Sequence, residues 1–235
     1  MLPGQVFAPA PLGMQVRDEL IARIAHDVRT PIGAILTWLE VLKAQATDPQ
    51  ARRAIEMAQQ SARDLSEIVA GAEDAQRIVA GTIELQRAPL DLVSLLNAVA
   101  ERVRPSTQSR DIVLHCDLAP SVTLARGDGR RLRHVFTRVL AHCVSLSGPG
   151  TVRLVLRADE EEARVCIACP GLTLSSALQR ALVTEGEWPS IAGPGGQAVL
   201  DCAVACRVIN LHGGRLETES LDGQGTRLSA SLPLA

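Results

Sequence analysis

Apolar residues recur at alternating steps of three and four along two stretches in the first third of the chain. This is the a/d spacing of helices that pack along a seam. It predicts one helix over residues 15 to 46. It predicts a second helix that Asp48 caps, that has Pro49 at its first position, and that ends near Val79. The seam positions are Ile21, Ile24, Val28, Pro31, Ile35, Trp38 and Leu42 in the first helix, and Ala51, Ile55, Ala58, Ala62, Leu65, Val69 and Ala72 in the second.

Two long helices joined by a short turn form an antiparallel hairpin. A single hairpin cannot bury both seams fully, so we expect two chains to associate into a four-helix bundle. The alternative is a hairpin that packs on the second domain of its own chain.

The rest of the chain mixes helical and alternating patterns. Its order predicts an α+β sandwich in which helices cover one face of a mixed sheet. The expected organisation is a flexible tail or connector (1–14), a helical hairpin (15–80), a hinge (81–89) and the sandwich (90–235). The expected helices span residues 90–103, 128–147 and 197–211, and the expected strands span residues 112–118, 151–157, 163–169, 215–220 and 226–232.

Composition narrows the function classes. The formal net charge of −2 gives no support for nucleic-acid binding. No apolar run is long enough to span a bilayer, so we expect a soluble chain or a fragment. Cys166 and Cys169 have the spacing of a metal-ligand pair, but no second pair matches them. We therefore expect the six cysteines to be buried, reduced thiols, which places the chain in the cytoplasm.

The stretch from Ala25 to Pro31 carries the candidate chemistry. His26 is a nucleophile that can take up a phosphoryl group at neutral pH. Asp27 can accept the other ring N–H and so make the free nitrogen more basic. Thr30 follows one helical turn later. The heptad register places His26 away from the seam. The alternative interpretation is an ordinary surface histidine beside an acid.

The run His26-Asp27-Val28-Arg29-Thr30-Pro31 resembles the H-box of bacterial sensor histidine kinases. The resemblance covers about residues 15–235. It implies a dimerisation and histidine-phosphotransfer hairpin followed by an ATP-binding domain. Scaffold segments of that second domain also resemble the family at residues 127–133, 211–217, 225–226 and 232–234.

The nucleotide ligands of the family do not match. Arg138 and His142 stand where the family has two asparagines, and neither offers an oxygen to a hard cation. Residues 167–172 lack the family's adenine-binding aspartate, and residues 197–201 replace a glycine box, with Asp201 at the last glycine. Residues 193–196 contain three glycines, and a shift of register there would restore a phosphate loop. We expect a degenerate domain that does not bind ATP.

The main hypothesis is a two-component phosphotransfer protein. His26 would exchange a phosphoryl group with a response-regulator aspartate, and the receiver domain would supply its own Mg²⁺. Asp27 would activate the imidazole, Arg29 would offset phosphate charge, and Thr30 would position water for dephosphorylation of the receiver. The chain itself would bind no metal or cofactor. The alternatives are a pseudokinase adaptor that regulates a partner kinase or response regulator, and an active histidine kinase with an atypical ATP site.

Overall fold

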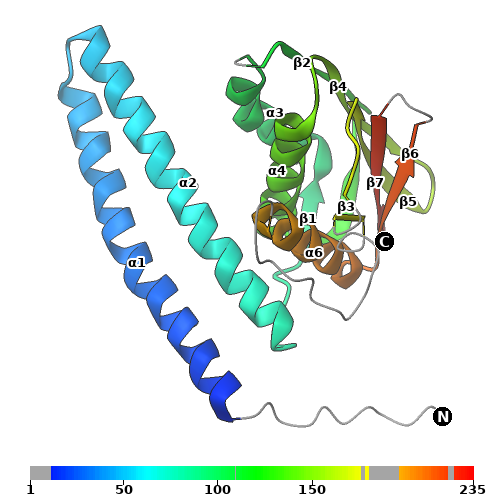
Figure 1. Cartoon of the computed structure of the whole chain (residues 1–235), viewed down its shortest axis with the longest axis horizontal. Coiled ribbons are helices and arrows are strands. Elements are labelled where there is room, and N and C mark those ends of the chain that lie inside the picture. Colours follow the sequence, from blue (N-terminus) through cyan, green and yellow to red (C-terminus); the bar gives the residue numbers. More distant parts are fainter. Residues whose placement is uncertain (1–11, 109, 176–177, 180–195, 222–224) are drawn as a thin grey trace. The chain divides into compact units, whose positions relative to one another are not determined.

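The computed structural model describes residues 12–108, 110–175, 178–179, 196–221 and 225–235. The chain divides into two compact units, Met1–Thr82 and Ile83–Ala235. Each unit is described separately (Figure 1). No helix of the described residues is both long enough and apolar enough to cross a membrane.

The first unit is a helical hairpin of α1 (Leu12–Gln45) and α2 (Pro49–Val79). The Asp48 side chain accepts the N–H of Ala51 at 3.0 Å and caps α2. Inside the hairpin, the buried Gln59 donates from Nε2 to Glu40 at 2.8 Å. A buried amide that needs a partner at one position of the other helix favours a single register of the two helices. The predicted hairpin is confirmed, although α1 already begins within the segment that we expected to be a tail.

The second unit is built on a five-stranded sheet with the strand order β2-β4-β5-β7-β6. Strands β2 and β4 are parallel, and the other pairs are antiparallel. Helices α3, α4 and α6 lie together on one face of this sheet (Figure 1). The predicted α+β sandwich with a mixed sheet is therefore confirmed. The bounds are β2 Ile112–Leu118, β4 Gly150–Ala158, β5 Glu162–Pro170, β6 Arg215–Ser220, β7 Gly225–Pro233, α3 Leu92–Gln108, α4 Gly129–Leu146 and α6 Gly196–Leu211.

Two short strands differ from the prediction. β1 (Ala88–Asp91) pairs with β3 (Thr123–Gly127) in a separate two-stranded sheet. β1 occupies residues that we had divided between the hinge and the first helix of this unit. That helix starts later because the Asp91 carboxylate accepts the N–H groups of Val93 and Ser94. It also continues through Pro105, which lies in the last turn of the helix, so that the proline interrupts only the final hydrogen bonds of α3.

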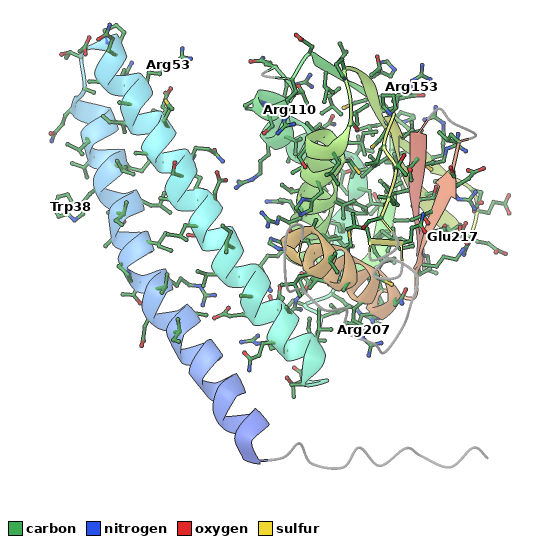
Figure 2. The ribbon with its side chains drawn as sticks, in the orientation of Figure 1. Trp38, Arg53, Arg110, Arg153, Arg207 and Glu217 are labelled. Atoms are coloured by element: carbon green, nitrogen blue, oxygen red, sulfur yellow. The ribbon has the colours of Figure 1, made fainter. Side chains whose placement is uncertain are left out.

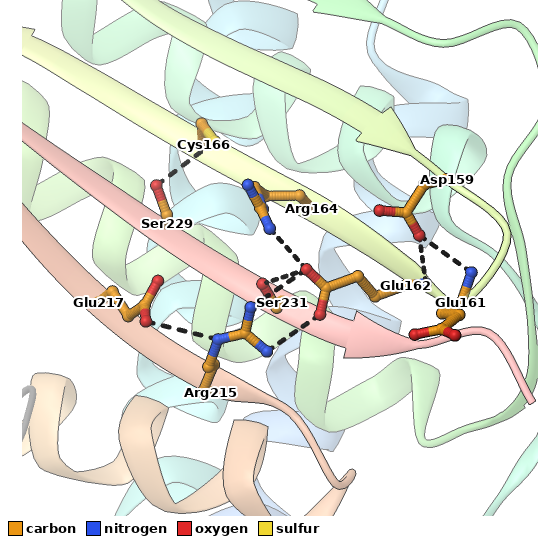
Figure 3. A network of polar contacts seen from close by, with 9 residues as sticks. All are labelled: Asp159, Glu161, Glu162, Arg164, Cys166, Arg215, Glu217, Ser229 and Ser231. Atoms are coloured by element: carbon orange, nitrogen blue, oxygen red, sulfur yellow. Dashed lines mark hydrogen bonds and ion pairs between the residues drawn. The ribbon is translucent and has the colours of Figure 1, made fainter.

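The outer face of the sheet, opposite the helices, is polar. The Glu162 carboxylate accepts hydrogen bonds from Arg164, Arg215 and Ser231 across three strands (Figure 3). Cys166 lies on the same face, and its Sγ is 3.4 Å from Oγ of Ser229. Residues three apart on a strand point to opposite faces, and Cys169 is buried in the core. Cys166 and Cys169 therefore do not form a metal-binding pair.

Candidate functional site

The candidate phospho-acceptor segment lies on α1, in the middle of the hairpin. Ala25 is buried before His26, and Ile32 is buried one residue after Pro31. Asp27 and Thr30 are both exposed. The backbone of His26 is helical, and its side chain is outside the described part of the structure. The segment is thus presented on a continuous helix, as its sequence predicts.

Arg29 joins the two helices of the hairpin. Its guanidinium forms an ion pair with the Glu73 carboxylate on α2. The Arg29 side chain is still half-exposed, whereas Glu73 is mostly covered. Arg29 therefore has a structural partner at the level of the H-box, which the sequence did not reveal. Its expected contact with a phosphoryl group remains a prediction.

The residues of the predicted α1 seam differ in burial. Val28 is half-buried in the hairpin, but Trp38 remains 68% exposed and points away from α2 (Figure 2). Apart from Val41 and Met57, the large exposed apolar residues described in the hairpin are Ile24, Ile35, Trp38 and Leu42 on α1, and Leu65 and Ile68 on α2. We call these six residues the apolar stripe.

Helical geometry places the apolar stripe on one face of the hairpin. Each residue of an α-helix is rotated by about 100° from the one before. On both helices, the stripe residues are therefore rotated by roughly a third of a turn from the residues that contact the other helix. The rotation has the same sense on both helices. Because the two helices are antiparallel, the same sense of rotation brings both sets to the same side. His26 lies two residues after Ile24, or about 200° around α1. The His26 position therefore falls on the side of α1 away from the stripe.

In the second unit, three side chains link α4 to α6. Arg138 donates from Nε and Nη2 to Oδ2 of Asp201, each at 2.8 Å. Nε2 of His142 lies 2.7 Å from the same oxygen. Since a carboxylate only accepts, this ring nitrogen carries the proton. Asp201 is 9% exposed, so its charge is nearly removed from water. We call Arg138, His142 and Asp201 the α4–α6 cluster.

The start of α4 is held by a second buried network. Asp128 accepts the N–H groups of Gln86 and Arg131, at 3.0 and 3.1 Å, and pairs with the Arg131 guanidinium at 2.8 Å. Burial alone would raise the pKa of Asp128, but these hydrogen bonds and the charge of Arg131 hold it below its ordinary value. The Asp128 N–H donates to Nε2 of His212 at 2.9 Å. This network fastens the chain after the hairpin to α4 and to the end of α6.

His212 is a structural histidine. Its Nδ1 lies 2.7 Å from the Val208 carbonyl, so Nδ1 carries the proton and Nε2 accepts from Asp128. Burial is the main cause of the lowered pKa of His212, because the protonated ring would lose its water. The ring is therefore neutral at neutral pH and cannot accept a second proton without breaking the bond to Asp128.

The residues at the end of β5 and just after it pack tightly on the start of β7. The Thr226 hydroxyl donates to the Leu172 carbonyl at 2.6 Å in a buried position. Gly225 has φ 129°, and a Cβ there would lie 2.0 Å from the Cys169 carbonyl oxygen. These contacts fix residues 169–172, where the sequence lacks the family's adenine-binding aspartate. Residues 193–195, which include two of the glycines of a shifted phosphate loop, are outside the described residues.

Two family descriptions match this chain. Residues 16–81 match the His Kinase A (phospho-acceptor) domain. Residues 127–235 match the histidine kinase-, DNA gyrase B- and HSP90-like ATPase. Together with curated relatives that are sensor kinases, these matches show that the chain belongs to the family of bacterial sensor histidine kinases. Its hairpin is the phospho-acceptor domain of that family, and its second unit is the ATPase-like domain.

The relatives are distant and longer. The chain is 27% identical over 229 residues to sensor protein GacS of Pseudomonas syringae pv. syringae, which covers 94% of this chain and 25% of GacS. It is 25% identical over 220 residues to the phosphate regulon sensor protein PhoR of Pseudomonas aeruginosa, covering 90% of this chain and 49% of PhoR. The chain thus spans a quarter to a half of these relatives.

Solved structures support the fold. Full-length ShkA in complex with AMPPNP aligns with a TM-score of 0.63 and 24% identity, over 92% of this chain and 46% of ShkA. The Acinetobacter baumannii histidine kinase AdeS aligns with a TM-score of 0.58 and 15% identity, over 89% of this chain and 98% of AdeS.

The sequence and the structure differ most at the α4–α6 cluster. Sequence reasoning identified Arg138, His142 and Asp201 separately, as residues unsuited to a nucleotide. It did not foresee that the three side chains bind one another. A signal was present, because a basic residue and a histidine at i and i+4 share one face of a helix, and a lone acid elsewhere in a buried pattern needs a partner. The roles expected for His26, Asp27, Arg29 and Thr30 remain predictions.

Proposed function

We propose that this chain is a two-component phosphotransfer protein that carries a phosphoryl group on His26 and does not charge that histidine from ATP. The α4–α6 cluster is the observation that carries the proposal. Two positions that would offer amide oxygens to Mg²⁺ and the triphosphate hold Arg138 and His142 instead. Both are committed to Asp201, which would repel a phosphate.

The chemistry assigned to the H-box needs no group from the second unit. A neutral His26 attacks the phosphorus of an aspartyl-phosphate on a receiver domain, and the carboxylate leaves as the phosphorus–nitrogen bond forms. The reverse step returns the group to a receiver aspartate. Asp27 holds the proton on the other ring nitrogen. Thr30 orients water when the bound receiver is dephosphorylated, Arg29 offsets the phosphate charge, and the receiver brings its own Mg²⁺.

We propose that the apolar stripe is covered by a second copy of this chain. Six large apolar side chains are exposed on one face of a two-helix hairpin, and a contiguous exposed apolar patch is typical of an interaction surface. A two-fold related copy presents the same face, so the stripe can cover itself. The His26 position stays outside that interface and remains open to a receiver domain. A partner histidine kinase with a similar hairpin could replace the second copy.

The matched region is only a quarter of GacS, so the relatives carry long additional regions. We propose for this chain the phosphotransfer activity alone. The described cysteines are free thiols, which fits a reducing compartment. We therefore place this chain in the cytoplasm, where receiver domains are available.

The first experiment is a calorimetric titration of the purified chain with Mg·ATP, followed by incubation of the same sample with γ-labelled ATP. We expect no binding up to millimolar nucleotide and no label on the protein. Micromolar binding together with an acid-labile label that disappears in His26→Gln would show an active kinase and would overturn the proposal.

The second experiment measures transfer from receiver domains that have been phosphorylated with acetyl phosphate. We expect label to move to the chain and to be absent in His26→Gln. The matched control is His115→Gln, because His115 is exposed on β2 and should accept no phosphoryl group.

The alternative function is a pseudokinase adaptor. It is equally consistent with the α4–α6 cluster, but it needs no phosphorylated histidine. It is favoured if no receiver labels His26 and if the His26→Gln variant keeps its biological activity.

A further inference from the structure

Residues 83–87 follow the first unit, lead into β1 and contain no helix or strand. We call them the connector. Hydrogen bonds attach the connector to two places in the second unit. At the first place, the start of α4, the Gln86 N–H donates to Oδ2 of Asp128 at 3.0 Å. There the Glu84 carbonyl also accepts from the Arg131 guanidinium.

The second place is the end of α6, where the Arg87 guanidinium donates to the Leu211 carbonyl at 2.7 Å. The next residue, His212, joins the two places, because its Nε2 accepts the N–H of Asp128 at 2.9 Å. Its Nδ1 donates to the Val208 carbonyl of α6 at 2.7 Å. The connector is thus attached to two helix ends that one buried imidazole bridges.

We propose that His212 is a proton-operated latch, which holds the connector on the second unit while its ring is neutral and releases the connector when the ring is protonated. A protonated imidazole carries an N–H on both nitrogens. Nε2 would then point a donor at the N–H of Asp128, so that hydrogen bond must break. Rotating the ring gives no relief, because Nδ1 is a donor as well. The imidazolium is instead attracted to the Asp128 carboxylate, where it competes with the Gln86 N–H.

The groups around the ring decide at which pH the latch opens. Burial opposes the charged ring most strongly, and the positive charges of Arg87 in the connector and Arg131 on α4 oppose it as well. The Val208 carbonyl and the Asp128 carboxylate favour the charged ring, but the pKa of His212 remains lowered. The latch is therefore closed above about pH 6.5, the ordinary pKa of histidine, and opens as the pH falls through the lower folded-state pKa.

An open latch lengthens the free chain between the two units. The five residues of the connector span at most about 17 Å when they are extended. The chain beyond the connector stays in place, because β1 is paired with β3. The release is thus a local opening and not an unfolding of the second unit. Acid would in this way loosen the connection between the hairpin that carries His26 and the ATPase-like domain.

Hydrogen exchange of the full chain between pH 8 and pH 5, read by NMR and corrected for the intrinsic effect of pH, tests the latch. We expect protection of the Gln86 amide to fall by up to about tenfold per pH unit below pH 6.5, because one proton is taken up. The fall should coincide with the titration of the His212 ring in the same samples, while the amides of β5 stay protected. His212→Gln should remove the pH dependence. The matched control is His115→Gln, which removes an exposed histidine of β2 and should behave like wild type.

Three results would overturn the inference. The first is a Gln86 amide whose protection does not change while the His212 ring titrates. The second is a ring that stays neutral down to pH 5. The third is an equal loss of protection in β5, which would mean that acid unfolds the whole unit. These results come from the wild-type chain, so they hold even if His212→Gln does not fold. They involve neither ATP nor a receiver domain, so failure of the latch would leave the proposed function untouched.

Discussion

His142 and Asp201 are 59 residues apart in the sequence, yet Nε2 of one lies 2.7 Å from Oδ2 of the other. Together with Arg138, this contact ties α4 to α6 across the region where a histidine kinase holds its nucleotide. The proposed loss of ATP chemistry and the stability of the second unit thus depend on the same three side chains.

Removing the shared acid should destabilise the second unit. Asp201→Asn leaves Arg138 and His142 partly buried without their common acceptor charge, which should lower the free energy of unfolding by about 1–3 kcal/mol. Urea unfolding followed by circular dichroism measures this change. Glu217→Gln, at an exposed position on β6, is the control and should be nearly neutral. Equal unfolding midpoints for Asp201→Asn and wild type would mean that the cluster adds nothing.

His212 should make the second unit less stable in mild acid. Its folded-state pKa is lowered by burial, whereas the unfolded ring has a pKa of about 6.5. Between these two values the unfolded chain binds more protons, so stability is complete above about pH 6.5 and falls as the pH drops through the folded pKa. Urea midpoints between pH 8 and pH 5 should fall more steeply for wild type than for His212→Gln. Parallel curves would remove His212 from the acid dependence.

Trp38 should be important for association of the hairpins. Trp38→Ser removes the largest side chain of the apolar stripe and should weaken the dimer about 30-fold, because buried tryptophans dominate interfaces. Sedimentation equilibrium measures the dissociation constant. Ala44→Ser is the control, since Ala44 is exposed and lies about 200° around α1 from Leu42. A monomeric wild type, or a Trp38→Ser dimer of unchanged affinity, would contradict the proposed interface.

Asp27 should affect transfer without affecting assembly. Asp27→Asn keeps the shape but loses the charge that orients the imidazole, so transfer to and from His26 should slow about 100-fold. Quenched-flow measurements with a phosphorylated receiver domain give the rate, and sedimentation tests the dimer. Asp64→Asn on α2 is the control, because Asp64 pairs with Gln60 on the exposed side. An unchanged rate in Asp27→Asn would exclude Asp27 from the mechanism.

Gly214 should tolerate no side chain. A Cβ at Gly214 would lie 2.0 Å from the Ser231 carbonyl oxygen, where β6 starts beside β7. Gly214→Ala should therefore cost about 2–4 kcal/mol, or roughly 5–15 °C in the melting temperature of a unit of this size. In the same unit, Gly148 has no atom within 4 Å of the corresponding Cβ position, so Gly148→Ala should melt close to wild type. Similar melting temperatures for both variants would refute the close approach.

The long elements were predictable because their signals are local. The seam of α2, the cap at Asp48 and the alternation of β2 each depend on residues within one element. β1 and β3 were missed because each is short and forms only by pairing with the other, at partners 32 to 39 residues away in the sequence. Tertiary pairing of this kind leaves no clear periodic signal.

The same distinction between local and long-range signals applies to the candidate site. The H-box could be found because its residues are consecutive, and each has a chemical reason for its place. The contacts of Arg29 with Glu73 and of Arg138 with Asp201 cross between helices. The sequence gives the charges of these residues but not their distance, so only the fold could join them.

The α4–α6 cluster also limits how this domain can change by mutation. A buried carboxylate that has lost its hydrogen-bond donors, or a partly buried guanidinium that has lost its carboxylate, makes a protein less stable than either the complete set or a set of uncharged residues would. A single substitution toward the family's asparagine and glycine pattern would therefore weaken the protein before it gained any affinity for a nucleotide. Arg138, His142 and Asp201 would have to change together, which makes the route back to an ATP site improbable in single steps.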